Sequence, residues 1–392
     1  MPFSDSPNAR SKSITTAELD TYGILNRHAS KNAAYTVGVS DDKGSRRTME
    51  DAHSFVVDFA NVRGQGFFAI FDGHAGKHAA EWCGGNFHLF LLSSMRRLGS
   101  MPIPDILNQT FHDVDEILSR MCEESNGKIH SGCTAVTALL RIEDQDGQQS
   151  FLPPSHDPDD PGSLSSNESV GSPSGDESAT NKKRRSLTAG RIRKAFKSLA
   201  SGSGSPKVSS SPQSATPKTP RSQSPTSAKG TAEGATVVIP PSTARRVLYC
   251  ANAGDARGVL CRNGIAVRLT YDHKGSDKQE AKRIIDAGGF VMSGRVNGVL
   301  AVTRSLGDAS MKEFVVGAPY TTETELCDQD EFLILACDGL WDVTDDQAAV
   351  DLIQHVDDAQ VASEMLLKHA VANHTSDNVT VLVVRFKNER ST

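Results

Sequence analysis

Gly66-Phe-Phe-Ala-Ile-Phe-Asp-Gly-His74 and Phe332-Leu-Ile-Leu-Ala-Cys-Asp-Gly339 are two similar stretches of this 392-residue sequence. Each opens with an apolar run whose length is typical of a buried strand, and each run ends at an Asp-Gly pair. The sequence therefore predicts two buried strands, one that stops at Asp72-Gly73 and one that stops at Asp338-Gly339.

Acidic residues beside Gly or Asn recur at four such element ends: Glu50-Asp51, Asp72-Gly73, Asp338-Gly339 and Asp377-Asn378. A single Asp-Gly pair is more often a turn than a ligand, because both residues favour turn conformations. Four acidic segments at the rim of one sheet structure would repel one another unless cations neutralised them. Because oxygen-only sites suit Mg²⁺ and Mn²⁺, the pattern favours a divalent-metal centre.

The flanking sequence predicts the other elements of the fold. Apolar alternation from Tyr35 to Val39 indicates a strand, and helices are expected over 76–98 and 103–121. Strands are expected over 133–141 and 246–250, and they are interpreted as a pair that a long insertion separates. Chain-closure entropy tolerates such an insertion, because its cost grows only logarithmically with length.

Towards the end of the chain, two capping-box patterns predict helix starts, Ser276 with Gln279 and Thr344 with Gln347. The first of these helices is expected to stop at Gly288-Gly289. A helix over 360–373 and a strand over 379–386 complete the prediction. Strands and helices come in clusters rather than in strict alternation, which favours an α+β fold: an α-β-β-α sandwich of two antiparallel sheets flanked by helices.

The predicted domain boundaries follow composition. Residues 1–33 are polar and are expected to form a flexible tail, and 34–388 are expected to form one catalytic domain. A Ser/Pro/Thr-rich insertion at 145–242 interrupts that domain and is expected to be disordered, because it cannot bury enough apolar surface. Its basic segment, 182–197, fits a nuclear signal, an anionic-membrane patch, a partner helix or a solvated run of charge.

Composition limits the classes of function. A net charge of −6 provides no general basic field, so a nucleic-acid partner is not expected. No apolar run reaches the length of a spanning helix and the opening residues lack a secretory pattern, so a cytoplasmic or nuclear protein without a membrane span is expected. The seven cysteines contain no C-x-x-C pair, and none is followed six positions later by Arg, as a cysteine-based phosphatase requires.

The sequence resembles the type 2C, metal-dependent Ser/Thr protein phosphatases, and the fungal members closely. Eight ordered segments outside the tail and the insertion carry the resemblance. They are Arg-Arg-Thr-Met-Glu-Asp (46–51), Phe-Asp-Gly-His-Ala-Gly (71–76), Ser-Gly-Cys-Thr-Ala (131–135), Ala-Asn-Ala-Gly-Asp-Ala-Arg (251–257), Thr-Tyr-Asp-His-Lys (270–274), Val-Asn-Gly-Val-Leu-Ala-Val-Thr-Arg-Ser-Leu-Gly-Asp (296–308), Ala-Cys-Asp-Gly-Leu-Trp-Asp-Val (336–343) and Ser-Asp-Asn-Val-Thr (376–380).

The resemblance implies a site for two Mg²⁺ or Mn²⁺ ions. Asp72 would bridge the ions, Glu50 and the Gly73 carbonyl would complete one site, and Asp338 with Asp377 would complete the other. A water molecule between the ions would attack the phosphate. The expected substrates are phosphoserine and phosphothreonine proteins of kinase signalling, with protein kinases among the partners, and the enzyme is expected to be a monomer.

Further roles follow from the resemblance alone. Arg46 would hold the substrate phosphate, because its planar guanidinium can make two charge-assisted hydrogen bonds. His74 would be the general acid for the leaving oxygen. Asp255 and Asp342 match a third, weaker metal site, although Asp255 beside Gly254 also fits a turn, and Asp51 would orient water.

Residues 274–295 would form the family's flap beside the site, and Trp341 is expected to be packed in the core. The sequence departs from the family pattern at Ala75, Ala256 and Gly275, where Gly, Ser and Pro are usual. Ala75 would restrict the backbone near the metals, and Ala256 removes a hydroxyl near the third site.

Two other functions fit the sequence less well. A pseudophosphatase acting as a scaffold or regulatory binding module predicts the loss of metal ligands, and the acidic set is intact. A nucleotide-binding P-loop fails at Gly76-Lys77, because His78 follows instead of Ser or Thr and Phe71 stands where the first Gly is needed.

Overall fold

The computed structural model describes residues 15–16, 21–22, 34–126, 128–152 and 237–387. Within the predicted tail, β1 (Thr15–Thr16) and β2 (Thr21–Tyr22) form a short antiparallel pair. The rest of that tail, residues 153–236 of the predicted insertion and the whole basic segment lie outside the described residues. The predicted domain boundaries therefore stay predictions.

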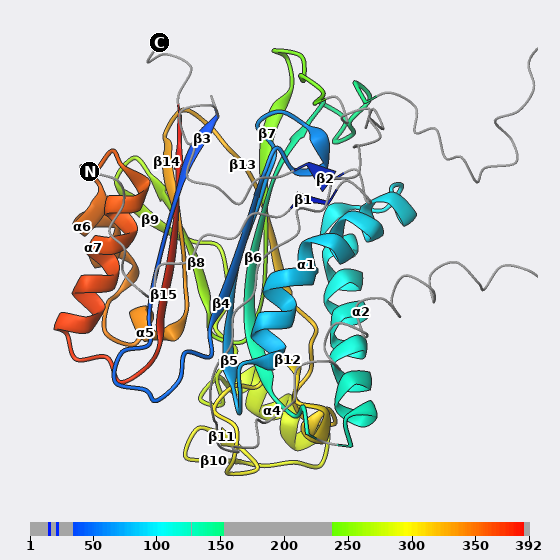
Figure 1. Ribbon diagram of the computed structural model, residues 1–392, viewed down its shortest axis with the longest axis vertical. Helices are drawn as coiled ribbons and strands as arrows, with labels where there is room; N and C mark the ends of the chain where they lie inside the picture. Colours follow the sequence, from blue (N-terminus) through cyan, green and yellow to red (C-terminus); the bar gives the residue numbers. More distant parts are fainter. Residues whose placement is uncertain (1–14, 17–20, 23–33, 127, 153–236, 388–392) are drawn as a thin grey trace, which may run out of the picture. The chain divides into compact units, whose positions relative to one another are not determined.

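Two antiparallel sheets form the centre of the fold, as the sequence predicted (Figure 1). The first sheet has the order β13-β7-β6-β5-β4, with β12 paired to β6, and the second has the order β3-β15-β14-β8-β9. The strands of the first sheet are β4 (Ala52–Val57), β5 (Gly66–His74), β6 (Gly132–Glu143), β7 (Arg245–Ala253), β12 (Leu306–Gly307) and β13 (Tyr320–Glu325). Those of the second are β3 (Tyr35–Asp42), β8 (Arg257–Arg262), β9 (Ile265–Arg268), β14 (Asp330–Ala336) and β15 (Val379–Phe386).

The strands on the two sides of the insertion pair directly. In the antiparallel ladder of β6 and β7, Leu140 stands opposite Leu248 and Glu143 opposite Arg245. This confirms the predicted pairing of 133–141 with 246–250. It also means that the chain leaves the first sheet at the end of β6 and re-enters it at the adjacent start of β7.

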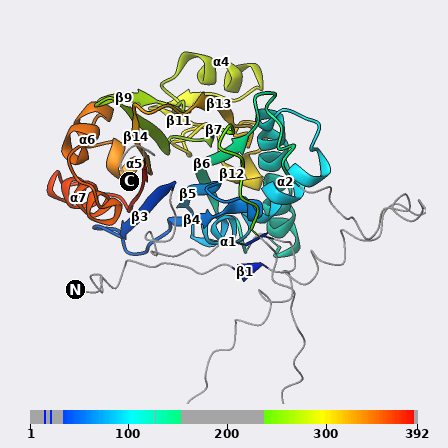
Figure 2. The same ribbon diagram turned by 90° about the horizontal axis from the view of Figure 1, so that it is seen from above.

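Helices cover the outer faces of both sheets (Figure 2). The helices α1 and α2 lie on the first sheet, and α6 and α7 lie on the second. Their bounds are α1 (His78–Arg97), α2 (Ile103–Glu124), α4 (Lys278–Asp286), α5 (Asp338–Trp341), α6 (Asp346–Ile353) and α7 (Ala359–Ala372). Short 3-10 turns, η3 (Phe59–Asn61) and η4 (Ala309–Met311), and a two-stranded hairpin of β10 (Val291–Met292) and β11 (Arg295–Val296) complete the described elements.

The apolar run of β5 is continuous because both of its faces are buried. Phe67 and Phe71 pack against Phe87 of α1 on the outer face. Phe68 belongs to the core between the sheets, where its ring meets Tyr35 edge-on. A strand buried on one face alone would alternate apolar and polar residues, so the unbroken run already indicates a strand between two layers.

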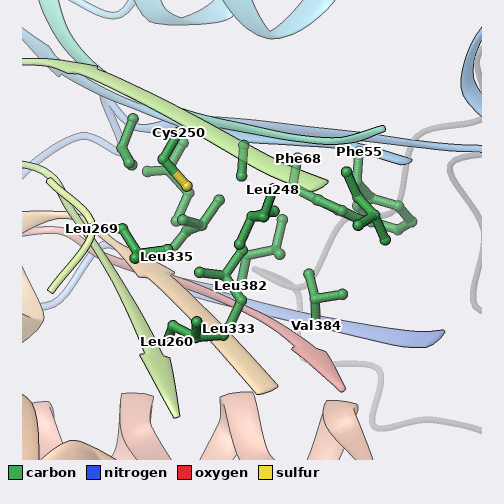
Figure 3. Packing of buried hydrophobic residues seen from close by; sticks show 14 of the residues in the cluster. Phe55, Phe68, Leu248, Cys250, Leu260, Leu269, Leu333, Leu335, Leu382 and Val384 are labelled. Atoms are coloured by element: carbon green, nitrogen blue, oxygen red, sulfur yellow. The ribbon is translucent and has the colours of Figure 1, made fainter. Parts of the chain in front are cut away.

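The core between the sheets is built from alternate residues of both sheets (Figure 3). Phe68 and Leu248 come from the first sheet, and Leu260, Leu335 and Leu382 from the second. A second cluster, outside the second sheet, includes Trp341 at 6% exposure, which confirms it as core. No helix in the described part of the chain is long and apolar enough to cross a bilayer.

Four local predictions were wrong in detail. Strand β5 does not stop at Asp72 but continues through His74, because Asp72, Gly73 and His74 pair with small residues of β6. The cap of α4 is Asp277, not Ser276: its carboxylate accepts from the Gln279 and Glu280 amides.

The cap of α6 is likewise Asp345, which accepts from the Ala348 amide, and not Thr344. Asp and Ser cap helices about equally well, so residue type alone does not decide which of two adjacent residues becomes the cap, and the backbone conformation at each position decides it. The helix α1 begins at His78, two residues later than expected, and Gly84 within it leaves room for β4: a Cβ there would lie 3.3 Å from the Ala52 Cβ.

Candidate active site

Because β5 extends through His74, the strand determines which way the side chains of Asp72 and His74 point. Because successive side chains of a strand point to opposite faces, Asp72 and His74 lie on the same face of the sheet and Gly73 lies between them. The end of β5, the start of α5 and the segment of α4 with β10 and β11 all lie toward the lower end of the view in Figure 1. The predicted ligand Asp72 and the predicted acid His74 are thus neighbours on one strand.

Carboxylates from three elements gather next to Asp72. Single oxygens of Asp72, Asp255 and Asp338 all lie within 4.8 Å of one another. Asp255 follows β7 after Gly254, whose φ of +104° turns the chain, and Asp338 is the first residue of α5. Asp51 and the Cys337 thiol form a second such group with Asp72.

This group is electrostatically unfavourable without a counter-charge. Burial, and then the charges of Asp51, Asp338, Asp255 and Asp377, raise the pKa of Asp72 well above its ordinary value. Burial and the neighbouring aspartates likewise raise the pKa of Asp338 to about 8. Each carboxylate therefore makes it harder for the next to ionise.

The residues present fit hard divalent cations. The buried Oδ1 atom of Asp255 has no hydrogen-bond partner among the described residues, so one oxygen of the group is left for a ligand. Burial raises the pKa of the Cys337 thiol well above its ordinary value, so sulfur is a poor ligand here. A set of carboxylate oxygens without thiolate or imidazole is typical of Mg²⁺ or Mn²⁺ sites.

The backbones of Glu50 and Gly73 lie next to each other. The backbone of Glu50 lies so close that a Cβ on Gly73 would stand 2.3 Å from the Glu50 carbonyl oxygen. The side chain of Asn378 holds the Glu50 loop: its Oδ1 accepts from the Glu50 amide at 2.8 Å, and its Nδ2 donates to the carbonyls of Lys43 and Thr48. Sequence reasoning gave Asn378 no role beyond its place beside Asp377.

Asp377 and Arg46 contact each other at the edge of the site. A guanidinium nitrogen of Arg46 lies 2.6 Å from Asp377 Oδ2, and its Nε donates to the Ser376 carbonyl. The Arg46 side chain is 54% exposed, so solvent and a substrate can both reach it. The protein therefore supplies Asp377 with a partial counter-charge of its own.

The predicted third metal site contains an ammonium group. Lys274 Nζ lies 3.4 Å from Asp255 Oδ2 and 3.1 Å from Asp342 Oδ1. Asp342 is largely exposed and does not belong to the group formed by Asp72, Asp255 and Asp338. Of the two residues expected there, the structure thus places Asp255 among the other acids and Asp342 at the surface.

Asp51 is buried beside the predicted ligands. Its Oδ2 accepts a hydrogen bond of 2.6 Å from the Thr380 hydroxyl. Burial raises the pKa of Asp51 to about 6, although the Thr380 bond opposes the shift. Asp51 lies next to Asp72, and its expected role in orienting water stays a prediction.

His74 has a partner that sequence reasoning missed. Its Nε2 lies 2.7 Å from Oδ2 of Asp308, which follows β12. Asp308 ends the quoted segment 296–308, but its distance from His74 along the chain hid the contact.

Comparison with known proteins agrees with this geometry. A family model described as Protein phosphatase 2C matches residues 35–144 and 174–379. The Saccharomyces cerevisiae protein named Protein phosphatase 2C homolog 1 is 37% identical over 354 residues, which cover 89% of this chain and 93% of the yeast protein. The Schizosaccharomyces pombe protein of the same name is 33% identical, over 93% of this chain and 77% of that protein.

The chain belongs to the protein phosphatase 2C family. It is a fungal-type member and a protein-serine/threonine phosphatase. Solved structures show the same fold at low identity. A serine-threonine phosphatase 2C from Toxoplasma gondii has a TM-score of 0.59 at 18% identity, covering 94% of this chain and 98% of that one. A sex determining protein of C. elegans has a TM-score of 0.59 at 21% identity, covering 90% and 65%.

The structure shows the surroundings of the three residues that depart from the protein phosphatase 2C pattern, Ala75, Ala256 and Gly275. Ala75 has a φ of +54°, a conformation that favours glycine. Ala256 is buried in the core between the sheets. At Gly275 a Cβ would lie 2.4 Å from the Gly294 carbonyl oxygen, so the β10–β11 hairpin approaches too closely for a larger residue there.

Proposed function

We propose that this phosphatase hydrolyses phosphoserine and phosphothreonine in proteins by a metal-dependent reaction without a covalent phosphoenzyme. The observation that carries the proposal is the partly buried group of Asp72, Asp255 and Asp338, whose mutual repulsion bound cations would relieve. Two Mg²⁺ or Mn²⁺ ions would be held by Glu50, Asp72 and the Gly73 carbonyl, and by Asp72, Asp338 and Asp377, respectively. When bound, such ions lower the pKa of water and stabilise negative charge on phosphate oxygens.

The remaining residues bind the substrate and move a proton. Arg46 would bind the phosphate with its exposed guanidinium, which already lies next to the site through its contact with Asp377. His74 would donate a proton to the oxygen of the departing serine or threonine, because it faces the same side of the sheet as Asp72. Asp51, held by Thr380, would accept a hydrogen bond from water near the reacting phosphate.

The proposed function also includes the substrates, the cellular compartment and the oligomeric state of the enzyme. The substrates would be phosphoproteins of kinase signalling in the cytoplasm or nucleus, and the enzyme would act as a monomer. Family membership supports a phosphoprotein substrate. The pathway rests on the family resemblance alone.

A pseudophosphatase is the competing function, and the acidic set argues against it. That function tolerates the loss of ligands, whereas Glu50, Asp72, Asp255, Asp338 and Asp377 are all present. Asp255 Oδ1, which is buried and has no hydrogen-bond partner within the described part of the chain, also argues for a working site, because a chain released from metal binding gains stability by losing such a group.

Activity of the purified full chain on a phosphothreonine peptide tests the proposal. Activity with Mn²⁺ or Mg²⁺ is expected to vanish with a chelator, and Asp72→Asn is expected to lower kcat by at least about 10²-fold. Asp113→Asn, which alters a helix-surface ion pair with Arg97, is the matched control and should leave kcat unchanged. Calorimetric titration with Mn²⁺ should show weaker binding to Asp72→Asn. Activity that survives chelation or Asp72→Asn would contradict the metal-dependent reaction.

A further inference from the structure

The contact between Asp308 and His74 is more constrained than a chance ion pair. Asp308 is buried, and Oδ2, the oxygen that contacts His74, also accepts the Ser305 hydroxyl at 2.5 Å. Across the sheet, Gly132 of β6 provides the space for this carboxylate: a Cβ at Gly132 would lie 2.2 Å from Asp308 Oδ2. The Ser305 hydroxyl thus holds the Asp308 carboxylate, and the absence of a side chain at Gly132 leaves the space that it occupies.

The backbone that carries Asp308 is in an unfavourable conformation and is held there from α2. Asp308 has a φ of +50°, and the preceding Gly307 has a φ of +86°. The Gly307 amide donates to Oδ1 of Asp115 on α2 at 2.9 Å, and Lys312 Nζ lies 2.7 Å from the same oxygen. Non-glycine residues with positive φ persist where surrounding contacts determine them, and they cluster at functional sites.

We propose that Asp308 is a positioning residue for the general acid His74, an inference that rests on the proposed function. By accepting a hydrogen bond from Nε2–H, Asp308 fixes the ring and leaves Nδ1 as the nitrogen that can donate to a substrate oxygen. The bonds to Ser305 and, through Gly307, to Asp115 keep that orientation before the substrate arrives.

The proton balance of this step is simple. The phosphorus–oxygen bond to the serine or threonine breaks, and its electron pair goes to the side-chain oxygen. That oxygen takes the Nδ1 proton of His74 and leaves as the alcohol, while water supplies the new oxygen on phosphorus, keeps one hydrogen on it and releases its other proton to solvent. The ring of His74, now neutral, keeps the proton on Nε2, where it is hydrogen-bonded to Asp308, and regains the Nδ1 proton from solvent.

Substrates with different leaving groups can distinguish a positioning role of Asp308 from a purely structural role. A serine or threonine alkoxide needs a proton as it departs, whereas 4-nitrophenolate is a stable anion that leaves without one. A defect in the positioning of His74 therefore slows the hydrolysis of a phosphothreonine peptide and spares 4-nitrophenyl phosphate. A defect in folding or in metal binding slows both reactions.

The experiment compares kcat and KM on both substrates for the full chain with Mn²⁺. For Asp308→Asn we expect kcat on the peptide to fall roughly 10- to 100-fold with little change in KM, and kcat on 4-nitrophenyl phosphate to stay within about threefold. His74→Asn should show the same selectivity, and the double variant should add little, because residues that act as a unit are not additive. Ser305→Ala should give a smaller loss of the same kind.

The outcomes decide between the alternatives. Equal losses on the two substrates, or an unchanged rate on the peptide, would overturn the role of Asp308. If Asp308→Asn does not fold, as judged by thermal unfolding, Ser305→Ala takes its place under the same criteria. Asp113→Asn is the matched control, since it alters a carboxylate ion pair away from the site. A wild-type chain inactive on both substrates would refute the proposed function itself, which is a different result.

Discussion

Two regions of this molecule bury acidic side chains, and they treat the charge in opposite ways. Glu280 of α4 is 3% exposed and accepts hydrogen bonds from Arg283, Arg304 and Thr303. Burial raises the pKa of Glu280, but the two arginines more than offset it and lower the pKa to about 2. Asp338, in the carboxylate group with Asp72 and Asp255, has a pKa raised to about 8.

The difference teaches that burial alone does not decide the charge of an acid. Around Glu280 the chain supplies its own cations, so the acid is fixed in place and ionised. Around Asp72 the cations of the chain pair with Asp255, through Lys274, and with Asp377, through Arg46, and the ion pairs of the described residues include neither Asp72 nor Asp338. The centre of that group is left for cations that come from solution.

The largest effect is expected from breaking the Glu280 network. Glu280→Gln would leave the guanidinium groups of Arg283 and Arg304 without their charged acceptor, and we expect the free energy of unfolding to fall by about 3 kcal/mol. Urea denaturation measures it. Asp286→Asn is the control, because its ion pair with Lys282 is exposed and should contribute under about 0.5 kcal/mol. A Glu280→Gln effect as small as the control would remove the contrast between the two regions.

The second effect is a pH dependence without metal. A folded pKa above the unfolded one means that stability is complete below the unfolded pKa and is lost as the pH rises through the folded pKa. With Asp338 at about 8, the metal-free chain should lose on the order of 2 kcal/mol between pH 6 and pH 8. Glu280 contributes no slope there, since its pKa of about 2 keeps it ionised throughout.

Denaturation in a chelator at the two pH values tests this, and saturating Mn²⁺ should remove most of the slope. The same binding should release protons, which calorimetry in buffers of different ionisation enthalpy detects. Equal stability at pH 6 and pH 8 without metal would show that the carboxylates are not in mutual repulsion.

A third effect has the opposite sign to the first. Asp338→Asn removes one partly buried charge from a group of like charges, so we expect the metal-free chain at pH 8 to become more stable by roughly 2 kcal/mol. Catalysis should be lost in the same variant. Urea denaturation at pH 8 in chelator checks the gain, and Mn²⁺ should stabilise Asp338→Asn less than it stabilises wild type. Destabilisation of the metal-free variant would mean that Asp338 is held by the fold, as Glu280 is.

The sequence predicted much of the fold because apolar runs report burial directly. The apolar runs of β14 and β15 located those strands, and β15 occupies the predicted residues 379–386. The acids at the strand ends were visible for the same reason, since a charged residue ends a buried run. Asp72 and Asp338 could therefore be chosen from the sequence pattern and Asp255 from the family resemblance, and the structure brings the three together.

The rest depended on contacts between distant segments. Asn378 holds the Glu50 amide across 328 positions, and Asp308 contacts His74 across 234. Neither pair leaves a periodic signal, because an amide or a carboxylate in a loop looks the same whether it positions a catalytic group or faces solvent. The contact of Lys274 with Asp255 and Asp342 was hidden in the same way.

The smallest effect concerns the backbone beside the carboxylates, where the sequence departs from its family. Ala75 follows His74 with a φ of +54° and is exposed, so Ala75→Gly relieves strain without loss of packing. We expect the free energy of unfolding to rise by about 0.5 kcal/mol. Ala348→Gly, at an exposed position of α6, should lower it by up to about 1 kcal/mol, because glycine weakens a helix. If both variants lower stability alike, the turn after His74 is not strained, and the site would then owe its instability to charge alone.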